Sequence, residues 1–247
     1  MSNGHLTVYD ILELRKRMSE ISQDAMNDRQ AVISLYPSFN SEIDIRISSI
    51  GRLLTTFNAT VLSLTLMNKY LMSSDWWYKN INSSYTDSEI IKYVAGYSWA
   101  HRASLIYNTF ACIESSFRIM LRAIDPSACS NALGSFKSVY DYLLNSKLSC
   151  CPNEGIEFLD LFRLLRNTVH NNGVYFHRSG RDETVHWQGN DYEFRQEIPV
   201  DFVNWSFCIT IANESRKLLK TVVENPILRE IDQEITDPFA FHIQGNL

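Results

Sequence analysis

The sequence predicts an all-α fold: a long antiparallel helical hairpin inside a helix bundle, with a small antiparallel β insertion of two or three strands. Two long stretches place apolar residues at alternating steps of four and three, which is the spacing of one face of a helix. Between residues 174 and 196 the spacing changes to every second residue, with turn sequences in between, which is typical of short strands.

Composition and charge are those of a globular chain. The 247 residues are 45% hydrophobic and 21% charged, and the net charge is −5. An acidic chain has no general attraction for nucleic acid, so any RNA binding would need a local basic patch. We expect three segments: an N-terminal helical segment (1–40), a helical bundle (41–225) with the β insertion at 174–196, and a C-terminal tail (226–247).

The cysteines and the apolar stretches indicate the cellular location of the protein. The five cysteines never form a C-x-x-C spacing, which is typical of free thiols in a reducing environment. The first residues lack the charged-then-apolar pattern of a secretion signal. Polar residues interrupt the longest apolar stretch, Val61–Met72, before it reaches the length of a membrane span. We therefore predict a cytoplasmic protein without a membrane span.

Three helices are expected in the first half of the chain. The first runs from Leu6 to Leu35 and must end before Pro37, because proline cannot continue a helix. The second runs from Ile43 to Leu71 and carries one of the two long apolar seams; a polar loop is expected from Asp75 to Tyr85. Thr86-Asp87-Ser88-Glu89 matches a capping box and opens the third helix, which carries the other seam.

Two shorter helices are expected next. Asp125-Pro126 ends the long helix, because the residue before a proline avoids the helical conformation. Residues Gly134–Leu148 have one apolar side, and so do residues Glu154–Asn171. Gly173 is well suited to the left-handed position that follows a helix C-terminus.

The last third of the chain contains the β insertion and a final helix. Val174–His177, Thr184–Trp187 and Tyr192–Arg195 alternate apolar and polar residues and are separated by the turn sequences SGRD and QGND. Asp201 is expected to cap a helix from Phe202 to Glu224, which Asn225-Pro226 ends.

The helix predicted over 154–171 carries the most informative polar face. Arg163, Arg166, Asn167 and His170 lie at offsets 0, 3, 4 and 7, so they share one face of a helix. One interpretation is an anion-binding acid/base site. The other is a capped helix end, in which His170 interacts with the helix dipole and Arg163 pairs with Asp160.

The run LLRNTVHNNG, late in a predicted helical bundle, resembles the signature of the HEPN superfamily (higher-eukaryote and prokaryote nucleotide-binding domains). That signature is an arginine, four to six further residues and a histidine, often with a polar residue directly after the arginine. Arg166, Asn167 and His170 match it with three intervening residues. Counting from Arg163 gives six intervening residues but no adjacent asparagine, so both arginines are candidates.

The resemblance implies an α-helical homodimer that cleaves RNA without a metal or any other cofactor. His170 would act as general base or acid, Arg166 with Arg163 would stabilise the phosphorane, and Asn167 and Asn171 would position phosphate or ribose. It also implies a toxin–antitoxin or antiphage defence context, with an antitoxin or regulatory protein as a partner. The alternative is a non-catalytic HEPN-like helical module for dimerisation or interaction.

Two residues on the second long helix are further candidates. Glu114 either forms a solvated ion-paired face with Arg118 and Arg122, or crosses the bundle to orient Arg166 or Arg163. His101 is either a second proton-transfer group or a hydrogen-bonded core histidine. No carboxylate or cysteine cluster accompanies the other histidines at ligand spacing, so no metal site is expected.

Overall fold

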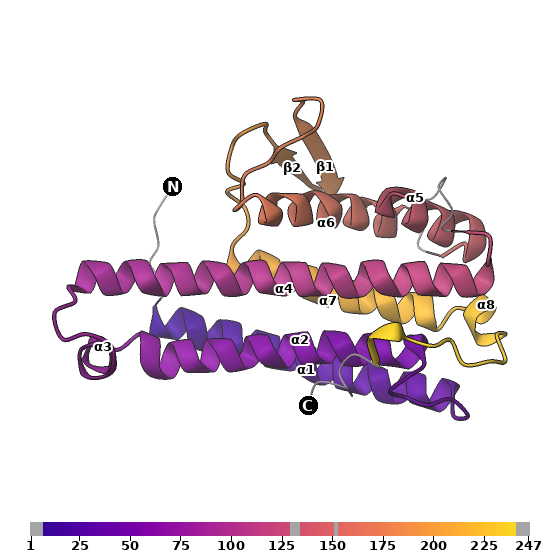
Figure 1. The fold of residues 1–247 in the computed structure, drawn as a ribbon, viewed down its shortest axis with the longest axis horizontal. Coiled ribbons are helices and arrows are strands. Elements are labelled where there is room, and N and C mark those ends of the chain that lie inside the picture. Colours follow the sequence, from indigo (N-terminus) through magenta and orange to yellow (C-terminus); the bar gives the residue numbers. More distant parts are fainter. Residues whose placement is uncertain (1–6, 129–133, 151–152, 241–247) are drawn as a thin grey trace.

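The computed structural model describes residues 7–128, 134–150 and 153–240, and it confirms a mostly helical fold with a small antiparallel β insertion. The long helix α4 spans the length of the molecule, with α1 and α2 on one side of it and α5 and α6 on the other (Figure 1). The hairpin of β1 and β2 lies over α6 (Figure 1). The helices and strands are α1 Val8–Leu35, α2 Ile45–Leu66, α3 Ser74–Asn80, α4 Asp87–Ile124, α5 Phe136–Asp141, α6 Glu154–His170, α7 Trp205–Val223, α8 Pro226–Arg229, β1 Glu183–Trp187 and β2 Asn190–Phe194.

The long helices begin where their capping residues require. Thr7 and Thr86 each accept a hydrogen bond from the third backbone amide of the helix, and the side chains of Asp10 and Glu89 return the bond to the cap. The box that begins with Thr86 was predicted, and it is confirmed. Each reciprocal pair satisfies two of the backbone donors that a helix N-terminus leaves free.

Both predicted helices 43–71 and 134–148 finish in a π-helical segment rather than in α-helix. These segments are Met67–Leu71 and Tyr142–Lys147. The amide of Met72 donates to the carbonyl of Met67 at 3.1 Å, five residues back, which is the π pattern. The π-helical segment Met67–Leu71 is followed directly by the short helix α3.

The structure corrects the prediction of a loop at 75–85. Ser74–Asn80 forms helix α3, because the Ser73 hydroxyl caps it and the Trp77 indole donates to the carbonyl of Leu71 at 2.8 Å. This helix has no apolar period, since none of its residues is buried. Periodicity alone therefore could not reveal it.

Three further expectations shift. Only two of the three strand runs pair; Val174 forms an isolated bridge with Pro199 instead. The last helix starts at Trp205 with Asn204 as its cap rather than Asp201, since the Asn204 side chain accepts from the amide of Phe207 at 2.9 Å. The QGND turn is confirmed as the β1–β2 turn.

One hydrophobic core runs through the bundle and includes residues from all three predicted segments, from Ile11 to Ile235. Among the described residues, the stretch Ile45–Leu71 is long and apolar enough to span a membrane, with a mean hydropathy of 1.2 over its most apolar window. It packs against α1, α4 and α7 and buries residues along its length. A helix of a bundle core packs in this way; the cytoplasmic location and the absence of a membrane span stay predictions.

A fully buried ion pair fastens the C-terminal segment to the start of α2. The Arg46 guanidinium bonds both carboxylate oxygens of Asp44, at 2.9 and 2.6 Å, and neither side chain is exposed. Its remaining N–H groups donate to the backbone carbonyls of Leu228, Ile231 and Gln233 at 2.9 to 3.0 Å. Asp44 in turn accepts from the amide of Ile235 at 3.0 Å. The donors of the buried arginine are therefore used, and the penalty of burying its charge is offset.

Aromatic rings complete the surroundings of Arg46. Its guanidinium carbon lies 4.4 Å from the ring centre of Tyr36 and 4.5 Å from that of Phe39, in the connection between α1 and α2. Burial raises the pKa of the Tyr36 hydroxyl to about 12, so this ring stays neutral beside the cation. The one side chain thus contacts the α1–α2 connection, the start of α2 and the C-terminal segment.

Replacing Arg46 with alanine is expected to lower the free energy of unfolding by about 3–5 kcal/mol, because Asp44 and three carbonyls lose their partner. Urea unfolding followed by circular dichroism measures the change. Arg122→Ala, at an exposed position of α4, is the control and is expected to stay within about 0.5 kcal/mol. A loss below about 1 kcal/mol for Arg46→Ala would show that the pair is not a structural clamp.

Candidate functional site

Helix α6 presents its polar face outward because its other side is in the core. Phe158, Leu161, Phe162 and Leu165 are buried, whereas Arg163, Arg166 and Asn167 are half-buried and His170 and Asn171 are exposed. The predicted polar face therefore exists as a surface of the folded chain.

The helix ends directly after His170 in a Schellman motif. The amide of Gly173 donates to the carbonyl of Thr168 at 2.8 Å, and that of Asn172 donates to Val169 at 3.3 Å. Asn172, with φ of 55°, takes the left-handed position that was expected for Gly173, which follows with φ of 88°. Asparagine tolerates this conformation better than most residues, so the helix stops one residue earlier than its glycine suggests.

Arg163 is held by acidic residues. Its guanidinium lies 3.8 Å from the Asp160 carboxylate and 3.7 Å from that of Glu183 on β1. Asp160 also binds Lys137 at 2.9 Å and Tyr140 at 2.5 Å. The predicted pairing of Arg163 with Asp160 is confirmed, and the charge of this arginine is already balanced inside the chain.

Arg166 is different, because none of the described residues offers it a carboxylate within ion-pairing distance. Its guanidinium carbon lies 5.6 Å from the ring centre of Phe110 on α4, and Nη1 donates to the Asn167 side-chain oxygen at 3.4 Å. Nε has no acceptor among the described residues. Arg163 likewise leaves its Nε without an acceptor, so the two arginines differ in charge: Arg166 is the one that no described carboxylate balances, which is what an anionic ligand needs.

His170 lies one helical turn beyond Arg166. Its ring meets the ring of Tyr107 on α4 edge to face, with the centres 5.3 Å apart. No hydrogen bond or ion pair engages the ring among the residues that the structure describes. Asn171 donates from its side chain to the carbonyl of Asn167 at 3.0 Å, which fixes it beside the histidine. The site thus combines an exposed imidazole, an unbalanced guanidinium and two amides.

The two candidates on α4 lie elsewhere. Glu114 binds Arg118, four residues on, at 2.8 Å, which is the ion-paired face that was one of its two interpretations. His101 shares a hydrogen bond with the Ser63 hydroxyl of α2 at 2.9 Å, and its ring packs against that of Tyr97 at a tilt of 44°, with the ring centres 4.1 Å apart. Burial lowers the pKa of His101. Both contacts are structural, and His101 faces α2 rather than α6.

The remaining described histidines are engaged in the β insertion. Nδ1 of His177 accepts from the amide of Ser179 at 3.0 Å, which leaves Nε2 as the donor to Glu183 at 3.1 Å. His186 pairs with Asp191 at 2.9 Å on the surface of the hairpin. No group of three or more His, Cys, Asp or Glu side chains gathers among the described residues.

A small cavity of about 230 Å³ lies just past the end of α6. Trp99 and Arg102 of α4 line it, together with Val169 and Gly173 on either side of His170. Trp99 is 41% exposed and Tyr107 is 43% exposed, so two aromatic faces flank the histidine along α4. Arg102 donates to the carbonyl of Val203 at 2.5 Å, and none of the described carboxylates pairs with it.

Sequence reasoning missed Trp99, Arg102 and Tyr107. They lie some 60 to 70 positions before His170, and nothing in their local pattern distinguishes them from other residues of α4. Their proximity follows from the antiparallel packing of α6 on α4, which brings the end of one helix beside the middle of the other (Figure 1).

Comparison with known proteins returned no matching family model, no matching curated protein and no matching solved structure.

His101 is expected to titrate below its ordinary pKa of 6.5, because burial disfavours the charged ring. Because folding lowers the pKa of His101, its neutral ring contributes stability that is fully present above pH 6.5 and is lost as the pH falls through the lower pKa of the folded state. NMR titration of the ring signals measures the midpoint. In His101→Gln, which retains hydrogen bonding to Ser63, part of the acid destabilisation should disappear; a midpoint above 6.5 would contradict the assignment.

Proposed function

We propose that the chain is a HEPN-like, metal-independent endoribonuclease that acts as a homodimer through the polar face of α6. The observation that supports this most is the pairing of an exposed, unengaged His170 with the unbalanced guanidinium of Arg166 one turn away. These are the groups required for attack of an RNA 2′-hydroxyl on the adjacent phosphodiester. A toxin–antitoxin or antiphage context is part of the proposal and rests on the sequence resemblance.

The reaction needs one base and one acid. An imidazole takes the proton of the 2′-hydroxyl, whose oxygen then forms a bond to phosphorus. Arg166 stabilises the charge that builds on the phosphoryl oxygens, with Asn167 and Asn171 as neutral hydrogen-bond donors. The bond to the 5′-oxygen breaks as a second imidazole gives it a proton. The products are a 2′,3′-cyclic phosphate and a 5′-hydroxyl.

A single copy supplies only one such imidazole among its described residues. His101 faces α2, while His177 and His186 are engaged in the β insertion. A second His170 from a second copy would supply the other proton-transfer group. The reaction would therefore require a dimer. Docking α6 against its symmetry mate is an isologous contact, the commonest kind in homodimers.

The surroundings of His170 suit a single-stranded substrate. Tyr107 and Trp99 offer aromatic faces on which bases stack, and Arg102 adds a cation that no described carboxylate balances. A local groove of this kind is compatible with the net charge of −5, since phosphate contacts are made over a short range only.

The alternative is a non-catalytic HEPN-like module that uses the same face for dimerisation or partner binding. The conformation of Arg166 favours it, because its guanidinium lies back over Phe110 and bonds Asn167 instead of extending toward the imidazole. In this case His170 and Asn171 are contact residues and the face carries no chemistry.

Purified protein incubated with structured and unstructured RNA in excess EDTA is expected to yield 2′,3′-cyclic phosphate ends. His170→Ala should abolish cleavage, and Arg166→Ala should reduce its rate about 100- to 1000-fold, the usual effect of removing a group that stabilises transition-state charge. Arg163→Ala should reduce it far less, because Asp160 and Glu183 already balance that charge.

His186→Ala is the matched control, since it removes an exposed histidine from the hairpin and should leave the rate unchanged. Circular dichroism of each variant separates a lost active site from a lost fold. Equal background cleavage by wild type and His170→Ala would end the ribonuclease proposal and leave the non-catalytic module.

A further inference from the structure

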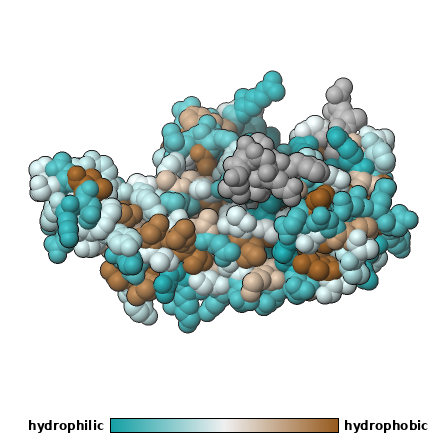
Figure 2. Space-filling view, turned by 60° about the horizontal axis from the view of Figure 1, so that its bottom comes forward, coloured by the Kyte–Doolittle hydropathy of each residue, from teal (hydrophilic) through white to brown (hydrophobic). Residues whose placement is uncertain are grey.

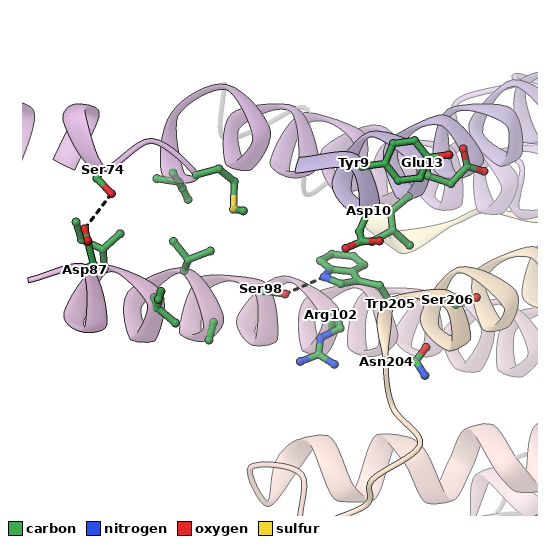
Figure 3. A pocket seen from close by; sticks show the side chains of 17 residues that line it. Tyr9, Asp10, Glu13, Ser74, Asp87, Ser98, Arg102, Asn204, Trp205 and Ser206 are labelled. Atoms are coloured by element: carbon green, nitrogen blue, oxygen red, sulfur yellow. Dashed lines mark hydrogen bonds between the residues drawn. The ribbon is translucent and has the colours of Figure 1, made fainter. Parts of the chain in front are cut away.

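A second cavity lies away from the α6 face, between the start of α1 and the first half of α4. It is a groove of about 760 Å³ (Figure 3). The end of the π-helical segment after α2 and the beginning of α7 also line it. None of the residues of the α6 motif lines it, so what it binds does not depend on the ribonuclease proposal.

The inside of the groove is apolar. Leu14 of α1, Leu71 and Met72 of the segment after α2, and Ile90 and Val94 of α4 contribute its walls. Ile91, also in the wall, is 44% exposed, so the apolar lining is continuous with the surface. Hydrophobic side chains also gather on the left part of the face in Figure 2, toward the end of the molecule where α3 lies.

The floor of the groove is rigid. The Trp205 indole donates to the Ser98 hydroxyl at 2.8 Å, and both side chains are almost completely buried (Figure 3). Since Trp205 is the first residue of α7 and Ser98 lies in the first half of α4, this bond joins two core helices across the floor. The apolar surface is therefore already formed before anything binds, which reduces the entropic cost of binding.

The rim of the groove is acidic. Asp10 and Glu13 of α1 lie at one end, and Asp87 of α4 lies at the other (Figure 3). Glu13 forms no ion pair or hydrogen bond among the described residues. Arg102, the one cation among the lining residues, points away from the groove toward α6 (Figure 3). Arg17 of α1 reaches the lining only at the α7 end, where it donates to the Ser206 hydroxyl at 2.9 Å. An occupant with positive charge at its polar edges would therefore complement this rim.

We infer that this groove binds a basic amphipathic helix of a second protein. Residues 87–102 of α4 line one wall, which at about 1.5 Å per residue is roughly 22 Å, the length of four helical turns. Apolar residues at i, i+3, i+4 and i+7 of such a helix would occupy the interior while lysine or arginine met Asp10, Glu13 and Asp87.

Two other occupants fit less well. A small molecule prefers a site that encloses most of its surface, whereas this groove leaves residues such as Ile91 and Tyr9 exposed. A second copy of this chain is acidic overall, with a net charge of −5, and would bring like charge to an acidic rim.

The test uses a synthetic probe of about 15 residues, with leucine on one helical face and lysine on the other. Its binding to the full chain is measured by fluorescence anisotropy and compared with a peptide that has glutamate at the lysine positions. The lysine peptide should bind and the glutamate peptide should not. Ala95→Arg, which fills the groove, should weaken binding at least tenfold, whereas Ala100→Arg, at an exposed position of α4 outside the groove, should change it less than twofold.

A second matched pair of variants distinguishes the effect of a rim charge from the effect of the net charge of the protein. Glu13→Lys should weaken binding about threefold or more, while Glu20→Lys, an exposed position two turns along α1 and outside the groove, should have less effect. Both changes alter the net charge equally. Equal effects within either pair, or equal binding of the two peptides, would overturn the inference. Self-association that Ala95→Arg abolishes and Ala100→Arg preserves would assign the groove to a second copy instead.

Discussion

The buried contact between Arg46 and Asp44 is the constraint on which the attachment of the C-terminal segment to the bundle depends. A guanidinium with no exposure is tolerated only because a carboxylate and three backbone carbonyls take its donors. Those carbonyls belong to residues 228–233, and the rings beside the cation belong to the α1–α2 connection. The C-terminal segment is therefore fastened to the α1–α2 connection and to the start of α2, and the core is closed at this end.

The opposite end of the bundle is less complete. There α4 begins well before α7 joins it, so the first half of α4 packs against α2 and, over a short stretch, against α3. The apolar groove and the exposed aromatic residues of α4 both lie in this half. The polar surface of α6 ends beside it, because α6 runs antiparallel to α4 (Figure 1). The surfaces available for binding are thus concentrated where the core is open, and the clamped end carries none of them.

Arg163 and Arg166 show what helical spacing can predict and what it cannot. Their spacing placed Arg163, Arg166 and His170 on one face, and the structure has them there. The same spacing gave no means to choose between the arginines. That choice depends on Glu183, which the hairpin brings to Arg163, and on Phe110, which α4 brings to Arg166. Each neighbour is distant in sequence, so its charge or ring cannot be assigned to the site before the helices are packed.

The sequence by itself determined the helical class, the long helices α1 and α4 with the capping box of α4, the hairpin turn and the polar face of α6. These features depend on the apolar period and on local hydrogen bonds, both of which act within a few residues. The sequence did not determine α3, whose side chains are unburied, or the buried role of Arg46, which an isolated sequence makes look like an ordinary surface cation. Only the tertiary structure decided which residues surround His170, where the groove lies and that its rim is acidic. These features arise from contacts between residues far apart in the chain, and such contacts exist only once the whole core has formed.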